Sequence, residues 1–206
     1  MTRSAGIQEL IGLREAEADR DRPDDETPDV GIIMGSDSDL DTMYGAYEAL
    51  TELGFEEVTD YDDPPANRFT FETFVISAHR TPGLMYVYGE TARDRGLDVI
   101  IAGAGGKSAD LPNMTASIAY PIPVIGVPVQ QKSVDSVIGM PTGAPIVAVD
   151  AGKSHNAALS AVQILSRAHS QLEARLEEYH DGLQDDVGAV SKRLHESGTE
   201  GFRKQR

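Results

Sequence analysis

The sequence predicts an α/β fold in which a five-stranded parallel sheet lies between two layers of helices, followed by a long C-terminal helix. Five short apolar runs recur from residue 29 onward. Each run is continuous rather than alternating, which is typical of strands covered on both faces. Helical patterns separate the runs, and strands that alternate with helices form βαβ units with a parallel sheet.

The expected strands can be placed by residue number. They are "VGIIMG" (30–35), "FETFVIS" (71–77), "DVIIAGAG" (98–105), "IPVIGVPV" (122–129) and "APIVAVDA" (144–151). This arrangement resembles a flavodoxin-like three-layer sandwich, whose usual strand order is 2-1-3-4-5. The last helical pattern is the longest and covers residues 154–183 without interruption.

The chain divides into three parts. Residues 1–28 are an acidic N-terminal extension with a short amphipathic helix, residues 29–170 form the catalytic α/β domain, and residues 171–206 form a C-terminal helical extension. Apolar positions continue into this last part at Leu172 and Leu176. We expect its end to pack on another subunit, with a solvated overhang as the alternative.

Composition excludes several classes of protein. With no cysteine, the chain has neither disulfides nor thiolate metal sites. A net charge of −16 would repel phosphate backbones, so nucleic acid is not an expected partner. No apolar run approaches the roughly 20 residues of a membrane span, and the N-terminus has no signal-peptide core, so a cytoplasmic location is expected. Only five of the 18 basic residues are lysine, which favours a halophilic source over an ordinary acidic cytosolic protein.

Small polar residues and glycines follow the first three expected strands. In the order 2-1-3 these strands are neighbours, and ligands bind at the carboxyl ends of parallel strands. We therefore expect the three ends to form one pocket. The residues concerned are Ser36 and Asp39, then Ser77, His79 and Arg80, and then Gly103, Gly105 and Gly106.

The chemistry of these residues suits a phosphorylated metabolite. Glycines let the backbone approach a ligand, and serine hydroxyls near helix N-termini bind phosphate. Arg80 adds a charged fork, whereas Asp39 suits sugar hydroxyls. His79 is the one histidine of the group, and histidine changes its charge near neutral pH.

Each motif also has a simpler interpretation. Ser36 and Asp39 are typical N-cap residues, and the glycine loop is also typical of a tight strand–helix turn. The glycine loop lacks the upstream glycine that an ATP-binding P-loop requires at its spacing before "GKS". No metal site is expected, because the aspartates near Asp39 lack partners at metal-ligand spacing.

Four motifs together resemble the N5-carboxyaminoimidazole ribonucleotide mutase family of purine biosynthesis. They are "GIIMGSDSD", "VISAHRTP", "IIAGAGGKSADLPNM" and "PVIGVPV…VDSVIGMPTGAPIVAV", and they cover about residues 29–170. The resemblance implies transfer of a carboxylate from the exocyclic nitrogen of an aminoimidazole ribonucleotide to ring carbon 4, without ATP, metal or organic cofactor. It also implies an octamer.

The same resemblance assigns roles to single residues. His79 would be the catalytic histidine. Ser36, Asp39, Ser77 and Arg80 would contact the phosphate and ribose of the substrate. Gly103, Gly105 and Gly106 would form the substrate-binding glycine loop.

The chain departs from the family pattern in its glycine loop, which reads "GGKSADLPN" instead of "GGAAHLPG". Asp110 stands where the family often has histidine, so no second catalytic histidine is expected. Lys107 and Ser108 favour a sister branch that carboxylates aminoimidazole ribonucleotide directly with carbon dioxide, whereas "SAHRTP" favours the mutase. A non-enzymatic flavodoxin-like nucleotide sensor or receiver is the remaining alternative.

Overall fold

Six parallel strands form a single sheet in the order β2-β3-β1-β4-β5-β6. The structure is a computed structural model that describes residues 4–20 and 22–205. The expected extensions 1–28 and 171–206 therefore lie partly outside the described residues. The division of the chain into three parts stays a prediction.

All five expected strands are present, and their expected order is confirmed. The expected number of strands is wrong by one, because β2 (Glu56–Glu57) adds a sixth strand at the edge of the sheet and pairs with β3. This strand has two charged residues and contributes no apolar run that the sequence could reveal. The other strands are β1 (Val30–Met34), β3 (Thr70–Val75), β4 (Val99–Ala104), β5 (Val124–Pro128) and β6 (Val147–Ala148).

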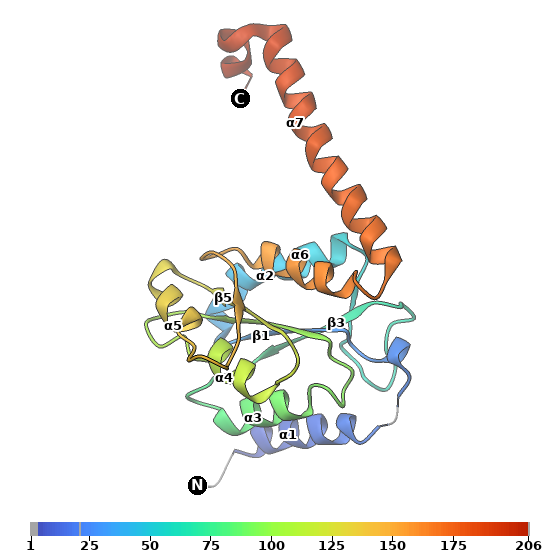
Figure 1. Ribbon diagram of the computed structural model, residues 1–206, viewed down its shortest axis with the longest axis vertical. Helices are drawn as coiled ribbons and strands as arrows, with labels where there is room; N and C mark the ends of the chain where they lie inside the picture. The colour runs from blue at the N-terminus through green and yellow to red at the C-terminus, as the bar shows by residue number, and fades with distance from the viewer. Residues whose placement is uncertain (1–3, 21, 206) are drawn as a thin grey trace.

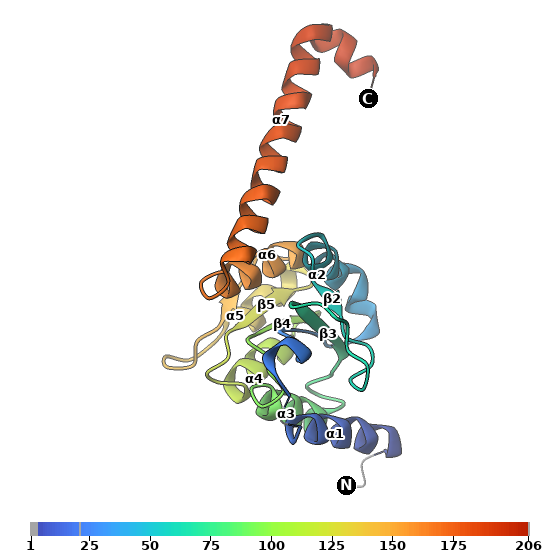
Figure 2. The same cartoon turned by 90° about the vertical axis from the view of Figure 1, so that its right-hand side faces the viewer.

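Helices cover both faces of the sheet (Figures 1 and 2). One face is covered by α2 (Leu40–Glu52), by α6 (Ser154–Leu165) and by the first turns of α7 (Ser170–Lys204). The opposite face is covered by α1 (Ala5–Ala18), α3 (Pro82–Thr91), α4 (Leu111–Ile118) and α5 (Val134–Ile138). None of the helices in the described part of the chain combines the length and apolar character of a membrane span.

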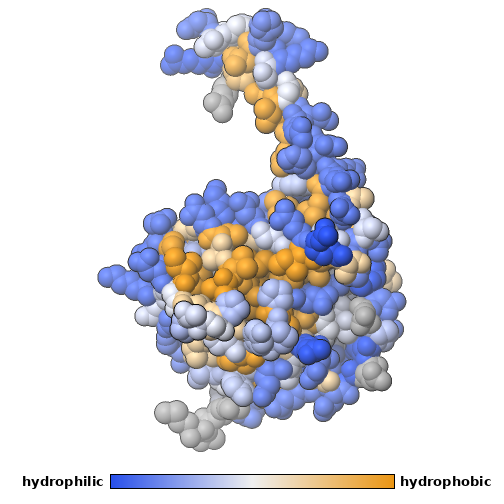
Figure 3. All heavy atoms as spheres, viewed as in Figure 1, coloured by the Kyte–Doolittle hydropathy of each residue, from blue (hydrophilic) through white to orange (hydrophobic). Residues whose placement is uncertain are grey.

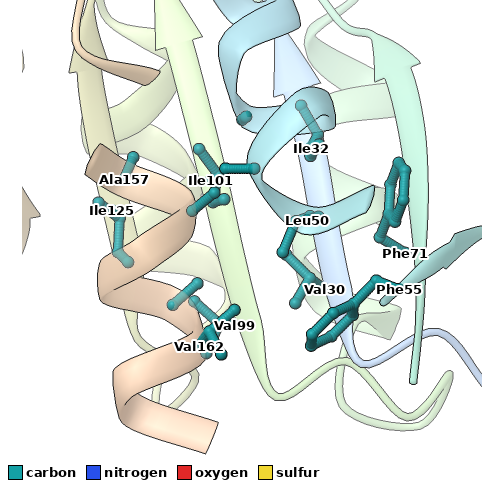
Figure 4. Packing of buried hydrophobic residues seen from close by; sticks show 14 of the residues in the cluster. Val30, Ile32, Leu50, Phe55, Phe71, Val99, Ile101, Ile125, Ala157 and Val162 are labelled. Atoms are coloured by element: carbon teal, nitrogen blue, oxygen red, sulfur yellow. The ribbon is translucent and has the colours of Figure 1, made fainter. Parts of the chain in front are cut away.

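The two helical layers explain why the strands are apolar throughout. Successive side chains of a strand point to opposite faces of the sheet. Ile32 of β1 accordingly packs toward α2, in the cluster shown in Figure 4, whereas its neighbour Ile33 packs toward α3 and α4. Both are at most 1 % exposed.

The uninterrupted helix expected over residues 154–183 is wrong. The structure ends α6 at Leu165 and begins α7 at Ser170, after a turn. The apolar sides of α6 and α7 both face the core that α2 also covers. Leu165 and Leu172 are buried in this same cluster. A straight helix could not bring both sides onto that core. Beyond its first turns, α7 projects away from the domain (Figure 1).

A buried carboxylate joins the N-terminal helix to the sheet. Glu72 of β3 is 0 % exposed and pairs with Arg14 of α1 at 3.2 Å and with Arg95, just beyond α3, at 2.6 Å. The hydroxyl of Tyr61 donates a third contact to the same carboxylate. Burial alone would raise the pKa of Glu72, but Arg95 and Arg14 outweigh burial and hold that pKa below its usual range.

We expect Arg14→Ala to destabilise the fold by about 2–4 kcal/mol, because it removes one partner of a buried charge. The matched control is Arg20→Ala, whose half-exposed guanidinium pairs with the exposed Asp62 and with Glu17, which keeps Arg22 as a second partner. The control should cost less than about 1 kcal/mol. Denaturant unfolding of both variants measures the difference. Equal free energies of unfolding for the two variants would contradict this account of Glu72.

Candidate functional site

A pocket with a cavity of about 480 Å³ opens at the carboxyl edge of the sheet. It lies where β1, β3 and β4 end side by side, as the strand order requires. Seven of the eight expected site residues line it. They are Ser36, Asp39, Ser77, His79, Arg80, Gly105 and Gly106.

Gly103 is the expected site residue that is not among those lining the pocket. It is buried within β4, and a Cβ built at this position would collide with the sulfur of Met43 in α2. Its lack of a side chain therefore allows α2 to pack closely on the sheet. Gly106, by contrast, has a φ of +85° within the loop itself, which favours glycine.

The end of β1 presents a serine and a buried aspartate. Gly35 donates its N–H to the carbonyl of Gly103 at 3.0 Å, which keeps the two strand ends together. Ser36 then caps the short helical turn Asp37–Asp39 and accepts from the N–H of Ser38. Asp39 is 7 % exposed, and burial raises the pKa of its carboxyl. A Cβ at Gly105 would lie 3.0 Å from an oxygen of Asp39, so glycine allows the loop to approach this carboxylate.

The end of β3 is fixed by its own side chains and by β1. The hydroxyl of Thr81 accepts from the N–H of Ser77 at 2.9 Å, and the hydroxyl of Ser77 accepts from the N–H of Arg80 at 3.2 Å. The guanidinium of Arg80 reaches across and donates to the carbonyl of Gly35 at 3.1 Å. No carboxylate in the described ranges forms an ion pair with Arg80, so its other N–H groups can meet an anion in the pocket.

His79 has a partner that the sequence did not indicate. Its Nε2 lies 3.0 Å from Oδ2 of Asp110, at the start of α4. The other oxygen of Asp110 accepts from the hydroxyl of Ser136 in α5 at 3.1 Å. An ionised carboxylate only accepts hydrogen bonds, so this contact assigns the proton of the neutral ring to Nε2. This contact links the ring of His79, after β3, to the start of α4, 31 residues later in the sequence.

Further polar residues complete the pocket. The sequence reasoning did not single out Gln130 and Lys132, which follow β5 and place an amide and a second cation in the lining. The same rule of strand ends could have found them, because β5 is next to β4. Ser108 also lines the pocket, whereas Lys107 is not among the lining residues.

The described part of the chain has no group of three or more His, Cys, Asp or Glu side chains arranged to hold a metal ion. The arrangement instead combines hydroxyls and cations for an anion with one histidine for proton transfer.

Comparison with known proteins connects this site to a family. A family model described as AIR carboxylase matches residues 29–186, which is more than half of the chain. The chain belongs to the AIR carboxylase family. The resemblance seen in the four sequence motifs is thereby confirmed at the level of the family. Helix α1 and the outer part of α7 lie outside the matched range.

Several relatives in the AIR carboxylase family carry the name N5-carboxyaminoimidazole ribonucleotide mutase. The relative from Mycobacterium tuberculosis is 46% identical, covering 84% of this chain and 93% of its own. The relative from Thermotoga maritima is 38% identical, covering 87% and 99%. The relative from Bacillus subtilis is 43% identical, covering 81% and 98%.

A solved structure supports the fold. The crystal structure of Treponema denticola PurE matches with a TM-score of 0.65 at 22% identity, covering 80% of this chain and 97% of that chain. At this identity the match concerns the fold, and it agrees with the expected flavodoxin-like architecture.

Proposed function

We propose that this chain is an N5-carboxyaminoimidazole ribonucleotide mutase of purine biosynthesis. The observation that carries the proposal is the meeting of Ser36, Ser77, His79 and Arg80 in one pocket of a chain that is 38–46% identical to relatives of that name. The reaction moves a carboxylate from the exocyclic nitrogen of the aminoimidazole to ring carbon 4. It is an isomerisation and takes no ATP, metal or organic cofactor.

The substrate's phosphate and ribose are bound by the ends of β1 and β3. The hydroxyls of Ser36 and Ser77 donate to phosphate oxygens, and Arg80 supplies the opposing charge. Asp39 accepts from ribose hydroxyls, since its carboxylate would repel phosphate. Gly105 and Gly106 let the aminoimidazole approach the backbone of the loop.

His79 carries the proton between the two half-reactions. In the first, the nitrogen–carbon bond of the carbamate breaks, carbon dioxide leaves, and the nitrogen takes a proton from the imidazolium. In the second, ring carbon 4 attacks carbon dioxide, and the neutral imidazole then removes the proton from carbon 4. The atoms balance, and the histidine returns to its starting state.

Carbon dioxide must stay in the pocket between these steps. The lining includes three apolar side chains, those of Ala78, Ala104 and Leu111. An apolar surface that excludes water suits this small, uncharged intermediate.

The alternative is direct carboxylation of aminoimidazole ribonucleotide by carbon dioxide, which the Lys107–Ser108 pair favours. Turnover of a carbamate substrate labelled with ¹³C in its carboxylate, in the presence of unlabelled carbon dioxide, separates the two reactions. The mutase retains the label in its product. Loss of the label, or turnover of aminoimidazole ribonucleotide and carbon dioxide alone, would favour the carboxylase.

We also propose a cellular setting and an assembly. The acidic surface, with a net charge of −16, suits a cytoplasm of high salt concentration. An octamer, as the family resemblance implies, would cover exposed apolar side chains such as Ile138, Val147 and Ile164. Figure 3 shows a broad hydrophobic area on the domain in this view.

Replacing His79 with asparagine should abolish proton transfer while keeping the polar surface. We expect His79→Asn to lower turnover by about 100-fold or more in both directions, with ribonucleotide binding retained. His195→Asn, an exposed position far along α7, is the matched control and should leave turnover unchanged. Calorimetric binding and turnover are measured on the same samples, and a folded His79→Asn protein with near-normal turnover would refute the mechanism.

Replacing Arg80 should affect binding more than chemistry, because the phosphate that it meets does not react. We expect Arg80→Ala to raise KM more than it lowers kcat. The control is Arg93→Ala, because Arg93 is an exposed residue that follows the end of α3 in the sequence. Steady-state kinetics decide the matter: an unchanged KM in a folded Arg80→Ala protein would leave Arg80 as a structural link to Gly35 only.

Asp110 should act through His79 rather than on the substrate. Asp110→Asn preserves shape but lowers the preference for one orientation and tautomer of the ring, so we expect kcat to fall about tenfold or more with little change in KM. Asp135→Asn, an exposed aspartate next to Ser136, is the control. A rise in KM with unchanged kcat would instead mean that Asp110 contacts the substrate.

A further inference from the structure

Lys132 is a cation of the pocket for which the mechanism above has no role. It belongs to the short helical turn Gln131–Ser133 between β5 and α5, and it lines the pocket. Among the residues that the structure describes, no carboxylate forms an ion pair with Lys132. Its ammonium group is therefore available to an anion in the pocket.

The segment that carries Lys132 is anchored on the domain. The next residue, Ser133, is 0 % exposed, and so is Val137 of α5, which packs in the core beneath α4. Asn113 of α4 donates its side-chain N–H to the carbonyl of Ser136 at 2.6 Å. The position of Lys132 is thus fixed relative to β5 and α4.

The same segment contacts the group that orients His79. The hydroxyl of Ser136 donates to Oδ1 of Asp110 at 3.1 Å, and Oδ2 of Asp110 lies 3.0 Å from Nε2 of His79. Lys132 precedes Ser136 by four residues and lines the same pocket. It therefore belongs to the part of the pocket where the carboxylate is transferred.

Arg80 and Lys132 lie on different sides of the pocket. The guanidinium of Arg80 donates to the carbonyl of Gly35 at the end of β1, whereas Lys132 follows β5. Strand β4 separates β1 from β5, and β5 and α5 lie on the side of the sheet away from β3 (Figure 1). Two strand spacings amount to about 10 Å. The pocket can therefore meet two separate anionic groups of one ligand.

We propose that Lys132 binds the carboxylate that the reaction moves and thereby selects carboxylated ribonucleotides, an inference that rests on the proposed function. The substrate has two anionic groups, the phosphate on its ribose and the carboxylate on its aminoimidazole. Arg80 meets the phosphate, beside the hydroxyls that follow β1 and β3. Lys132 meets the carboxylate, on the side of His79 and Asp110.

One ammonium group can serve both substrate and product. The carboxylate starts on the exocyclic nitrogen and ends on ring carbon 4, and these two atoms are attached to neighbouring positions of the ring. The flexible four-carbon stem of lysine lets its charge follow this short displacement. Carbon dioxide has no charge, so the contact is lost in the intermediate. Lys132 therefore stabilises substrate and product alike, and we expect it to lower KM in both directions without accelerating bond cleavage.

Calorimetric binding of two ribonucleotides tests the assignment. One is 4-carboxy-5-aminoimidazole ribonucleotide, and the other is its 4-carboxamide analogue, which has nearly the same shape but no carboxylate charge. We expect Lys132→Met to weaken binding of the carboxylate about tenfold and to leave binding of the carboxamide unchanged. Lys132→Arg should keep the preference for the carboxylate. Lys192→Met removes the same charge from an exposed position of α7 and should change neither affinity.

Arg80→Ala provides the opposite pattern, because both ribonucleotides carry the phosphate that Arg80 meets. It should weaken the two by the same factor. Steady-state kinetics of Lys132→Met should show a higher KM with kcat changed much less. Equal weakening of both ribonucleotides by Lys132→Met would place Lys132 at the phosphate, and no weakening would remove it from the site. Either result would overturn this inference alone, whereas wild-type protein that binds neither ribonucleotide would overturn the proposed function as well.

Discussion

The site depends on the register of three neighbouring parallel strands. Met34 of β1 lies opposite Val75 of β3 and also opposite Gly103 of β4. The three chains therefore leave the sheet at one level, and the loops that follow meet in one pocket. A slip of one residue would move a strand end by about 3.3 Å and turn its side chains to the other face. Apolar layers on both faces oppose such a slip, because it would move each buried strand side chain away from the helices on which it packs.

The Glu72 contacts connect this register to a part of the chain outside the family's range. Glu72 lies within β3, three residues before the strand ends, and Arg14 reaches it from α1. Helix α1 thus braces the strand whose end holds His79 and Arg80, although it contributes no residue to the pocket lining. Helix α1 and the first turns of α7 both pack on the core of the domain.

The sequence predicted those features that follow from local pattern. The five apolar runs indicated five strands, the likeness to a flavodoxin-like sandwich gave their order, and the rule of strand ends brought seven expected residues to one pocket. It missed β2, which has no apolar run, and the turn after Leu165, because both flanking helices have apolar faces. The resemblance placed Gly103 in the glycine loop, but its packing against the sulfur of Met43, some 60 residues earlier, is not visible in the sequence. The partner of His79 was equally hidden, since it depends on how α4 sits against the end of β3.

That partner changes how the departure in the glycine loop is understood. The family often has a histidine where this chain has Asp110, and an ionised carboxylate is a poor proton donor at neutral pH. Asp110 therefore does not replace a second proton carrier. Its contacts with His79 and Ser136 give it another role, because a carboxylate that accepts from one ring nitrogen fixes the ring and leaves the other nitrogen for the substrate. One histidine can then serve both half-reactions, since the proton that it gives to nitrogen is the proton that it recovers from carbon. In the proposed mechanism the loop thus supplies an orienting group, and the proton chemistry stays with the single histidine at the end of β3.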